Sequence, residues 1–179
     1  MNAARAGREG RFLSLLGQHE KILYKVAHAY CRSAADRDDL VQEMIAALWR
    51  SFDRYDERQR FSTWLYRVAL NVAISSYRRE KRRQDNIAEV DPASLDIAES
   101  AGERSEPLER LSDFIVGLGD IDKALMLLYL ESYTYEEIAT TLGLSETNVA
   151  TKLSRIKGQR EPPSTEAILR LRETQHDDR

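Results

Sequence analysis

Ten Lys or Arg side chains are interleaved with aromatic rings between residues 50 and 83. The same stretch holds four Asp or Glu, so its formal net charge is +6. Its rings are Phe52, Tyr55, Phe61, Trp64, Tyr66 and Tyr77. Cations bind phosphates and rings stack on unpaired bases, so this combination is typical of a surface for single-stranded or melted DNA. Two alternatives stay open: Phe61 and Trp64 could be core residues, and the basic end could be a solvated helix end.

A second polar group lies just before this basic stretch, in the segment DDLVQE at residues 38–43. On a helix, Asp39, Gln42 and Glu43 project from neighbouring turns, opposite an apolar face. An acidic and polar patch beside a basic DNA surface suggests a docking site for a basic protein partner. An ordinary solvated helix face explains the spacing equally well.

The segment YTYEEIATTLGLSETNVATKLSRIK at residues 133–157 predicts a helix-turn-helix. Thr134 and Glu137 match a capping box, Gly143 can supply a left-handed stop, and Ser145 can cap the second helix. Val149, Leu153 and Ile156 then face inward. The outward side chains are Thr147, Asn148, Thr151, Lys152 and Arg155.

Such an outward face, with short polar groups first and cations later, suits the major groove of DNA. The alternative is a helical hairpin packed in a bundle core. Few cations mean few phosphate contacts, so we expect this module to bind DNA weakly on its own.

The elements that must position these residues are helices, because apolar periodicity is helical throughout and no strand pattern occurs. We therefore predict an all-α fold. The expected helical regions are 13–30, 38–52, 61–83, 108–118 and a helix from 121 capped by Asp120. Residues 84–107 hold seven acids against one Arg and no amphipathic stripe, which predicts a flexible acidic linker. The predicted organisation is a domain at 10–83, the linker at 84–107, a helix-turn-helix domain at 108–158 and a tail at 159–179.

Composition argues against an enzyme and against a membrane protein. The chain has 179 residues, a net charge of −3, and a single cysteine, Cys31, so it can form no intrachain disulfide. We expect no membrane insertion and a cytoplasmic location, since no apolar run is long enough to span a bilayer or to act as a signal peptide. His19, His28 and His176 are scattered, so we expect no catalytic site, no metal and no cofactor; His28 and Cys31 share a helix face but fall short of a site.

Three segments together resemble the extracytoplasmic-function sigma factors of bacterial RNA polymerase, the minimal branch of the sigma-seventy family. DDLVQEMIAALW resembles their region 2.2, and RFSTWLYRVALNVAISSYRREKRR resembles regions 2.3 and 2.4. YTYEEIATTLGLSETNVATKLSRIK resembles region 4.2. The resemblance covers about Leu23–Arg83 and Leu108–Lys157. It implies a region 2 helical bundle and a region 4 helix-turn-helix, in a protein that directs core RNA polymerase to promoters.

The resemblance also implies roles for individual residues. Asp39, Gln42 and Glu43 would contact the β′ clamp helices of the polymerase, and Leu127 and Leu130 would belong partly to a surface for the β flap. The loop 53–60 and Asn71 would capture a flipped base of the minus-ten element, with Trp64 bracing that site and the basic helix end following the backbone. The minus-ten residues are Asp53, Arg54, Arg58, Arg60, Trp64, Asn71, Arg78, Arg79 and Arg82, with Lys81 and Arg83 beside them. The minus-thirty-five residues are Thr147, Asn148, Thr151, Lys152 and Arg155. An anti-sigma factor is expected as a further partner.

Two other classes of protein remain alternatives. A stand-alone helix-turn-helix regulator would bind duplex DNA tightly without polymerase, and would have no use for the patch at 38–43. A decoy would bind core polymerase and fail to start RNA synthesis. The tail at 159–179 could begin a short helix or fray, and we expect it to modulate access of DNA or polymerase.

Overall fold

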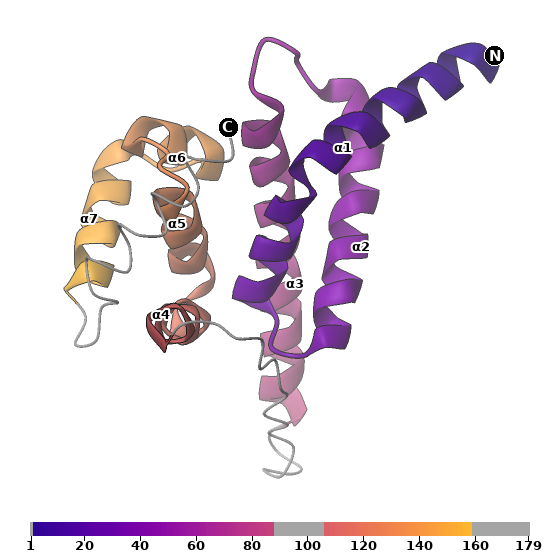
Figure 1. Cartoon of the computed structure of the whole chain (residues 1–179). Coiled ribbons are helices and arrows are strands. Elements are labelled where there is room, and N and C mark those ends of the chain that lie inside the picture. Colours follow the sequence, from indigo (N-terminus) through magenta and orange to yellow (C-terminus); the bar gives the residue numbers. More distant parts are fainter. Residues whose placement is uncertain (1, 88–105, 159–179) are drawn as a thin grey trace.

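The structure is a computed structural model, which describes residues 2–87 and 106–158. These residues form seven α-helices and one 3₁₀ helix, with no strand among them, so the predicted all-α fold is confirmed (Figure 1). The helices are α1 (Asn2–Tyr30), α2 (Ala34–Ser51), the 3₁₀ helix η1 (Phe52–Arg54), α3 (Phe61–Ile87), α4 (Glu106–Gly117), α5 (Asp120–Leu130), α6 (Tyr135–Leu142) and α7 (Glu146–Lys157). The predicted tail and most of the predicted linker lie outside the described residues.

Helices α1, α2 and α3 pack against one another and form an N-terminal unit. Its core takes Leu40, Met44 and Leu48 from α2 and Leu65 and Leu70 from α3, all of them buried. Ser33 caps α2, because its side chain accepts a hydrogen bond from the backbone N–H of Asp36. The apolar spacing therefore located these helices, but it did not identify the whole buried face, since Ile45, Val68 and Val72 of the same stripes are only half-buried.

Two helix ends differ from the prediction. Helix α1 begins at Asn2, ahead of its first apolar residues, and α3 continues through residues 84–87, which were assigned to the linker. Extending an existing helix by one residue costs far less than nucleating it, so α3 can continue past its apolar stripe even through Asp85 and Asn86, which have low helix propensity. The apolar residues of 61–83 predicted the position of α3, but they did not predict that the helix continues to Ile87.

Helices α4 to α7 form a C-terminal unit around α5, which is buried along most of its length. The capping box of Thr134 and Glu137 is present, Gly143 is left-handed at φ 67°, and the Ser145 side chain accepts from the N–H of Asn148. These three local predictions are confirmed. Asp120 was predicted to cap α5, and this is wrong: the N-cap is Gly119. Asp120 is the first helical residue, and its carboxylate is engaged by Arg78 of α3.

The two units lie against each other, with α5 facing α1 and α3 (Figure 1). Lys25 Nζ lies 2.7 Å from Glu131 Oε1, and the Tyr30 hydroxyl donates to the backbone carbonyl of Asp120 at 2.6 Å. The rings of Tyr66 and Tyr133 meet edge to face, with their centroids 5.6 Å apart. These pairs, together with Arg78 and Asp120, form what we call the closed contact. The sequence predicted two tethered domains and gave no sign of this contact.

One lysine is buried inside the closed contact. Lys123 is 2% exposed, and its Nζ lies 4.3 Å from the ring centroid of Tyr77 and 5.4 Å from that of Tyr30. The two rings favour the ammonium ion. Burial removes water from the ammonium group, and this desolvation outweighs the favourable rings. Desolvation, followed by repulsion from the charge of Arg32, lowers the pKa of Lys123 to about 8 from the ordinary 10.5.

We expect the closed contact to strengthen as the pH rises from about 8 toward 10.5. If opening returns Lys123 to water, the open chain binds more protons than the closed chain across this window, so linkage favours the closed form at the higher pH. Burial raises the pKa of Cys31 to about 11 and also raises the pKa values of Tyr30 and Tyr66, so wherever opening exposes these groups they favour the open form above about pH 9 and oppose the effect of Lys123. Small-angle X-ray scattering between pH 7.5 and 9, mostly below the range in which Cys31 and the tyrosines titrate when exposed, measures the effect of Lys123, and Lys123→Met should remove the dependence. A radius of gyration with the same pH profile in both proteins would contradict this expectation.

Candidate nucleic-acid interface

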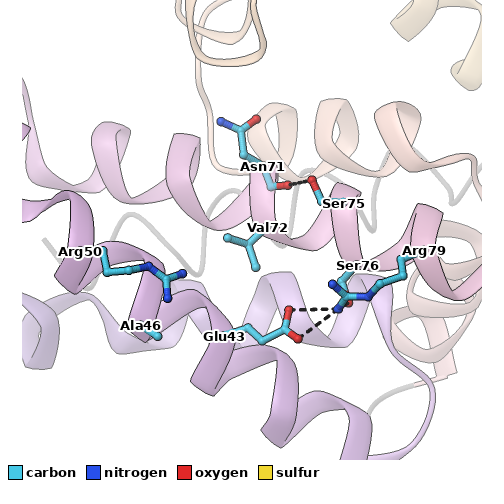
Figure 2. A pocket seen from close by; sticks show the side chains of 8 residues that line it. All are labelled: Glu43, Ala46, Arg50, Asn71, Val72, Ser75, Ser76 and Arg79. Carbon is cyan, nitrogen blue, oxygen red and sulfur yellow. Dashed lines mark hydrogen bonds and ion pairs between the residues drawn. The ribbon is translucent and has the colours of Figure 1, made fainter.

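An open groove of about 540 Å³ runs between α2 and α3 (Figure 2). It is lined by Glu43, Ala46, Arg50, Asn71, Val72, Ser75, Ser76 and Arg79. The groove therefore brings Glu43, a predicted polymerase contact, together with Asn71 and Arg79, two predicted minus-ten residues. From the sequence, the polymerase patch on α2 and the minus-ten residues on α3 are expected to form two separate surfaces. The packing of α2 on α3 joins them into one groove.

Glu43 and Arg79 are paired across this groove. Arg79 Nη2 donates to Glu43 Oε1 at 3.1 Å and to the Ser76 hydroxyl at 3.3 Å. Both partners are about half exposed, so the pair contributes little to stability. Figure 2 shows the Asn71 amide directed away from this pair, so the amide and the ion pair offer separate contacts. The Asn71 backbone carbonyl accepts from the Ser75 hydroxyl at 2.7 Å, a bond within α3.

The polar loop 53–60 is held by two arginines of α1. Arg8 Nε lies 2.7 Å from Asp53 Oδ1, and Arg8 Nη2 donates to the backbone carbonyl of Trp49 at 3.0 Å. Arg11 Nη1 lies 2.5 Å from Glu57 Oε1, and this contact lowers the pKa of the Glu57 carboxyl. The sequence analysis missed Arg8 and Arg11. Their spacing of three residues places them on one side of α1, but nothing local indicates that their partners lie in this loop.

Trp64 lies inside an aromatic cluster beneath the loop. It is 6% exposed, and its ring centroid is 5.2 Å from that of Tyr55 and 5.4 Å from that of Phe61. The Tyr55 hydroxyl donates to the backbone carbonyl of Gln59 at 2.9 Å, which ties the cluster to the loop. A bracing role for Trp64 fits this position, whereas stacking of its ring on a base does not.

The expectation that the aromatic rings of residues 50–83 offer exposed platforms for bases is corrected by their burial. Four of these rings are buried and two are half-buried. The buried rings are Phe52, Phe61, Trp64 and Tyr66, and the half-buried rings are Tyr55 and Tyr77. Aromatic side chains carry the largest apolar surfaces, so a small helical unit places them in its core.

The basic end of α3 is exposed, but several of its cations are paired with acids. Arg78 pairs with Asp120 and Arg79 with Glu43, and Arg83 Nε lies 3.0 Å from Glu80 Oε2. Arg82 Nε donates to the Arg78 carbonyl at 3.2 Å, a bond within the helix. In the loop, Arg58 pairs with Asp56, while Arg54 and Arg60 are exposed. Several of these arginines must therefore leave a carboxylate before they can reach a phosphate, although the net charge of +6 already counts Asp56 and Glu80.

The outward face of α7 has the predicted orientation. Val149, Leu153 and Ile156 are buried, and the predicted readers are exposed except Lys152, which is half-buried. The exposed readers are Thr147, Asn148, Thr151 and Arg155. Lys152 and Arg155 both pair with Asp122 of α5, a residue that the sequence analysis did not single out.

The two predicted protein-docking surfaces differ in accessibility. Asp39, Gln42 and Glu43 are exposed on α2, and α2 lies on the far side of the N-terminal unit from α5 (Figure 1). Leu127 and Leu130 are 8% and 7% exposed, so the surface anticipated there for the β flap is core in this structure. Helix α5 is apolar on most of its faces and packs against five other helices, so even leucines that could face a partner are buried.

Residues 2–87 and 106–158 contain neither a metal-ligand cluster nor a membrane-spanning helix. No group of three His, Cys, Asp or Glu side chains there is arranged to hold a metal ion. Among the helices of these same ranges, none combines the length and the apolar character needed to cross a membrane.

Comparison with known proteins matches both units to one family. The family models for Sigma-70 region 2 and Sigma-70, region 4 match residues 15–83 and 109–159. The chain is 26% identical over 167 residues to the RNA polymerase sigma factor CnrH of Cupriavidus metallidurans, covering 87% of each chain. It is 26% identical over 157 residues to the ECF RNA polymerase sigma factor SigL of Mycobacterium tuberculosis, covering 86% of this chain and 88% of that one.

A solved structure shares the arrangement of the helices. It is the sigma factor RpoE in complex with the anti-sigma factor NepR from Bartonella quintana, with a TM-score of 0.63 and 18% identity, over 92% of this chain and 96% of that chain. At this identity the likeness concerns the fold alone. The two family models together span most of the chain and occur in the order of its two units. This chain therefore belongs to the extracytoplasmic-function branch of the sigma-seventy family.

Proposed function

We propose that this sigma factor binds core RNA polymerase through the exposed α2 patch of Asp39, Gln42 and Glu43, and opens the minus-ten element on the neighbouring α2–α3 groove. The observation that carries the proposal is that Glu43 and Asn71 line the same groove. A polymerase docked on one wall would hold melted DNA against the other. Helix α7 reads the minus-thirty-five element with its exposed face.

Pairing of the cations supports a dependence on polymerase. Arg78, Arg79, Lys152 and Arg155 each contact an acid of the same chain. A cation that must leave a carboxylate to reach a phosphate contributes less to binding than an unpaired one. Two weak modules then bind well only when a larger partner holds them at the right separation. A stand-alone regulator, which must hold DNA unaided, is disfavoured on the same ground.

The domain organisation and the cellular setting complete the proposal. Residues 10–83 and 108–158 act as separate DNA-contacting domains joined at 84–107. The chain works in the cytoplasm, where core polymerase is found, and has no catalytic site of its own. An anti-sigma factor controls it, as the structure of the RpoE relative with NepR suggests.

One experiment tests the reading as a whole. The chain is mixed with core polymerase and a library of random promoter sequences, and the transcripts are sequenced. Starts that depend on the added chain and share two sequence elements support the proposal. Tight promoter binding without polymerase would instead support the regulator, and polymerase binding without any new start would support the decoy.

Glu43→Lys is expected to weaken the complex with core polymerase about tenfold, because it reverses a charge that faces a basic partner. Fluorescence anisotropy of the labelled chain, titrated with core polymerase, measures the dissociation constant. Glu43→Gln separates the reversed charge from mere loss of the Arg79 pair, and should cost less. Glu20→Lys, an exposed charge reversal on α1, should leave the constant unchanged; equal losses from Glu20→Lys and Glu43→Lys would exclude the assigned patch.

A further inference from the structure

Asp122 stands between the hydrophobic contact of α5 with α7 and the outward face of α7. It lies in the first turn of α5, and its side chain is 13% exposed. Arg155 Nη2 lies 2.5 Å from Asp122 Oδ2, and Lys152 Nζ lies 3.4 Å from Oδ1. Each carboxylate oxygen thus receives one cation of the recognition helix.

The two cations are held to different degrees. The Lys152 side chain is 28% exposed, whereas the Arg155 side chain is 59% exposed. A guanidinium carries five N–H donors, and the contact with Asp122 uses Nη2, so donors remain for the edge of a base. A carboxylate on one edge of Arg155 restricts its rotamers and aims the rest of the group.

We propose that Asp122 is a positioning residue that makes α7 selective rather than adhesive, by fixing Arg155 for base reading and cancelling one of the two positive charges there. The inference rests on the proposed role of α7 at the minus-thirty-five element. Phosphate contacts bind every sequence alike, while base contacts distinguish sequences. Removing the carboxylate should therefore strengthen binding to phosphates and weaken discrimination between base sequences.

Asp122→Asn tests this with the full chain bound to core polymerase. Asn keeps the size of the side chain and removes its charge. The probes are two promoter fragments with the same minus-ten element, one carrying the minus-thirty-five sequence selected by the transcript experiment and one carrying a scrambled sequence. Affinities are measured at several KCl concentrations, and a thermal unfolding scan checks the fold.

The expected result is about a tenfold loss of discrimination between the two fragments, on the order of one base contact. The scrambled fragment should bind about threefold more tightly, and the salt slope should steepen by about one, since one more phosphate contact becomes available. Asp113→Asn removes the same charge from the exposed surface of α4 and should show none of this. In an Arg155→Ala background, Asp122→Asn should cause no further loss of discrimination.

Each other outcome has a distinct meaning. Equal weakening on both fragments, or a lowered unfolding temperature with unchanged discrimination, would show that Asp122 only supports the fold and would overturn the proposal. Discrimination and salt slope equal to those of Asp113→Asn would overturn it as well. If the wild-type complex itself did not distinguish the fragments, the assigned function of α7 would fail first, which separates the two claims.

Discussion

Asn71→Ala is expected to slow the formation of open promoter complexes about thirtyfold while leaving polymerase binding unchanged. The Asn71 amide is exposed on the groove wall and is directed away from the Glu43–Arg79 pair (Figure 2). An amide offers both a donor and an acceptor to a base edge, and such a contact discriminates by about 2 kcal/mol, or about thirtyfold. A flipped base must recover the cost of leaving the stack, so losing the contact should appear in opening. Permanganate reactivity of thymines in the minus-ten element, followed over time, measures it.

Ser75 supplies the matched control for this experiment. It lines the same groove one turn along α3, and its hydroxyl donates to the Asn71 carbonyl within the helix. Ser75→Ala should therefore change the opening rate less than twofold. If Ser75→Ala slowed opening as much as Asn71→Ala, the groove would matter only as a surface. If Asn71→Ala lost polymerase binding, the assignment of Asn71 to DNA would be wrong.

The parts of the fold that follow from local chemistry could be predicted from the sequence. The capping box of Thr134, the left-handed Gly143 and the cap at Ser145 each depend on residues within a few positions of one another. The buried face of α7 follows from helical spacing in the same way. Such features need no knowledge of what packs against the helix, so one sequence suffices to place them.

Features that depend on distant partners could not be predicted. Lys25 and Glu131 are 106 residues apart, and Arg155 and Asp122 are 33 apart. Nothing in the periodicity of either segment indicates such a pair, because a charged residue on a helix looks the same whether it meets an acid or water. Trp64 illustrates the related limit for rings, since composition alone does not distinguish a base-stacking ring from a core ring.

The closed contact has a consequence for the order of binding. Arg78, a predicted minus-ten residue, is engaged by Asp120 of the C-terminal unit. The α2 patch lies on the other side of the N-terminal unit, where α5 does not reach it (Figure 1). On the proposed assignments, polymerase can dock on the closed chain, while use of Arg78 on DNA requires its ion pair with Asp120 to break, which separation of α5 from α3 would accomplish. We expect docking to precede opening of the chain.

Glu131→Lys is expected to shift the chain from the closed to the open arrangement. The Glu131 side chain is 18% exposed and meets Lys25, which is 37% exposed, at 2.7 Å, so reversal places two ammonium groups together in a partly buried site. Removing one partner of such a pair and replacing it with a like charge costs about 2 kcal/mol or more, which lowers the ratio of closed to open about thirtyfold. Small-angle X-ray scattering should show a larger radius of gyration than for the wild-type chain.

A charge swap separates loss of the pair from damage to α5. The double variant Lys25→Glu, Glu131→Lys restores opposite charges at the same two positions and should return the radius of gyration most of the way to the wild-type value. Added salt should expand the wild-type chain slightly and compact Glu131→Lys, because screening weakens attraction in one and repulsion in the other. If Glu131→Lys kept the wild-type radius, this ion pair would not hold the units together. The closure would then have to rest on the other members of the closed contact, and truncation of its ring pair by Tyr133→Ala should open the chain further than Glu131→Lys does.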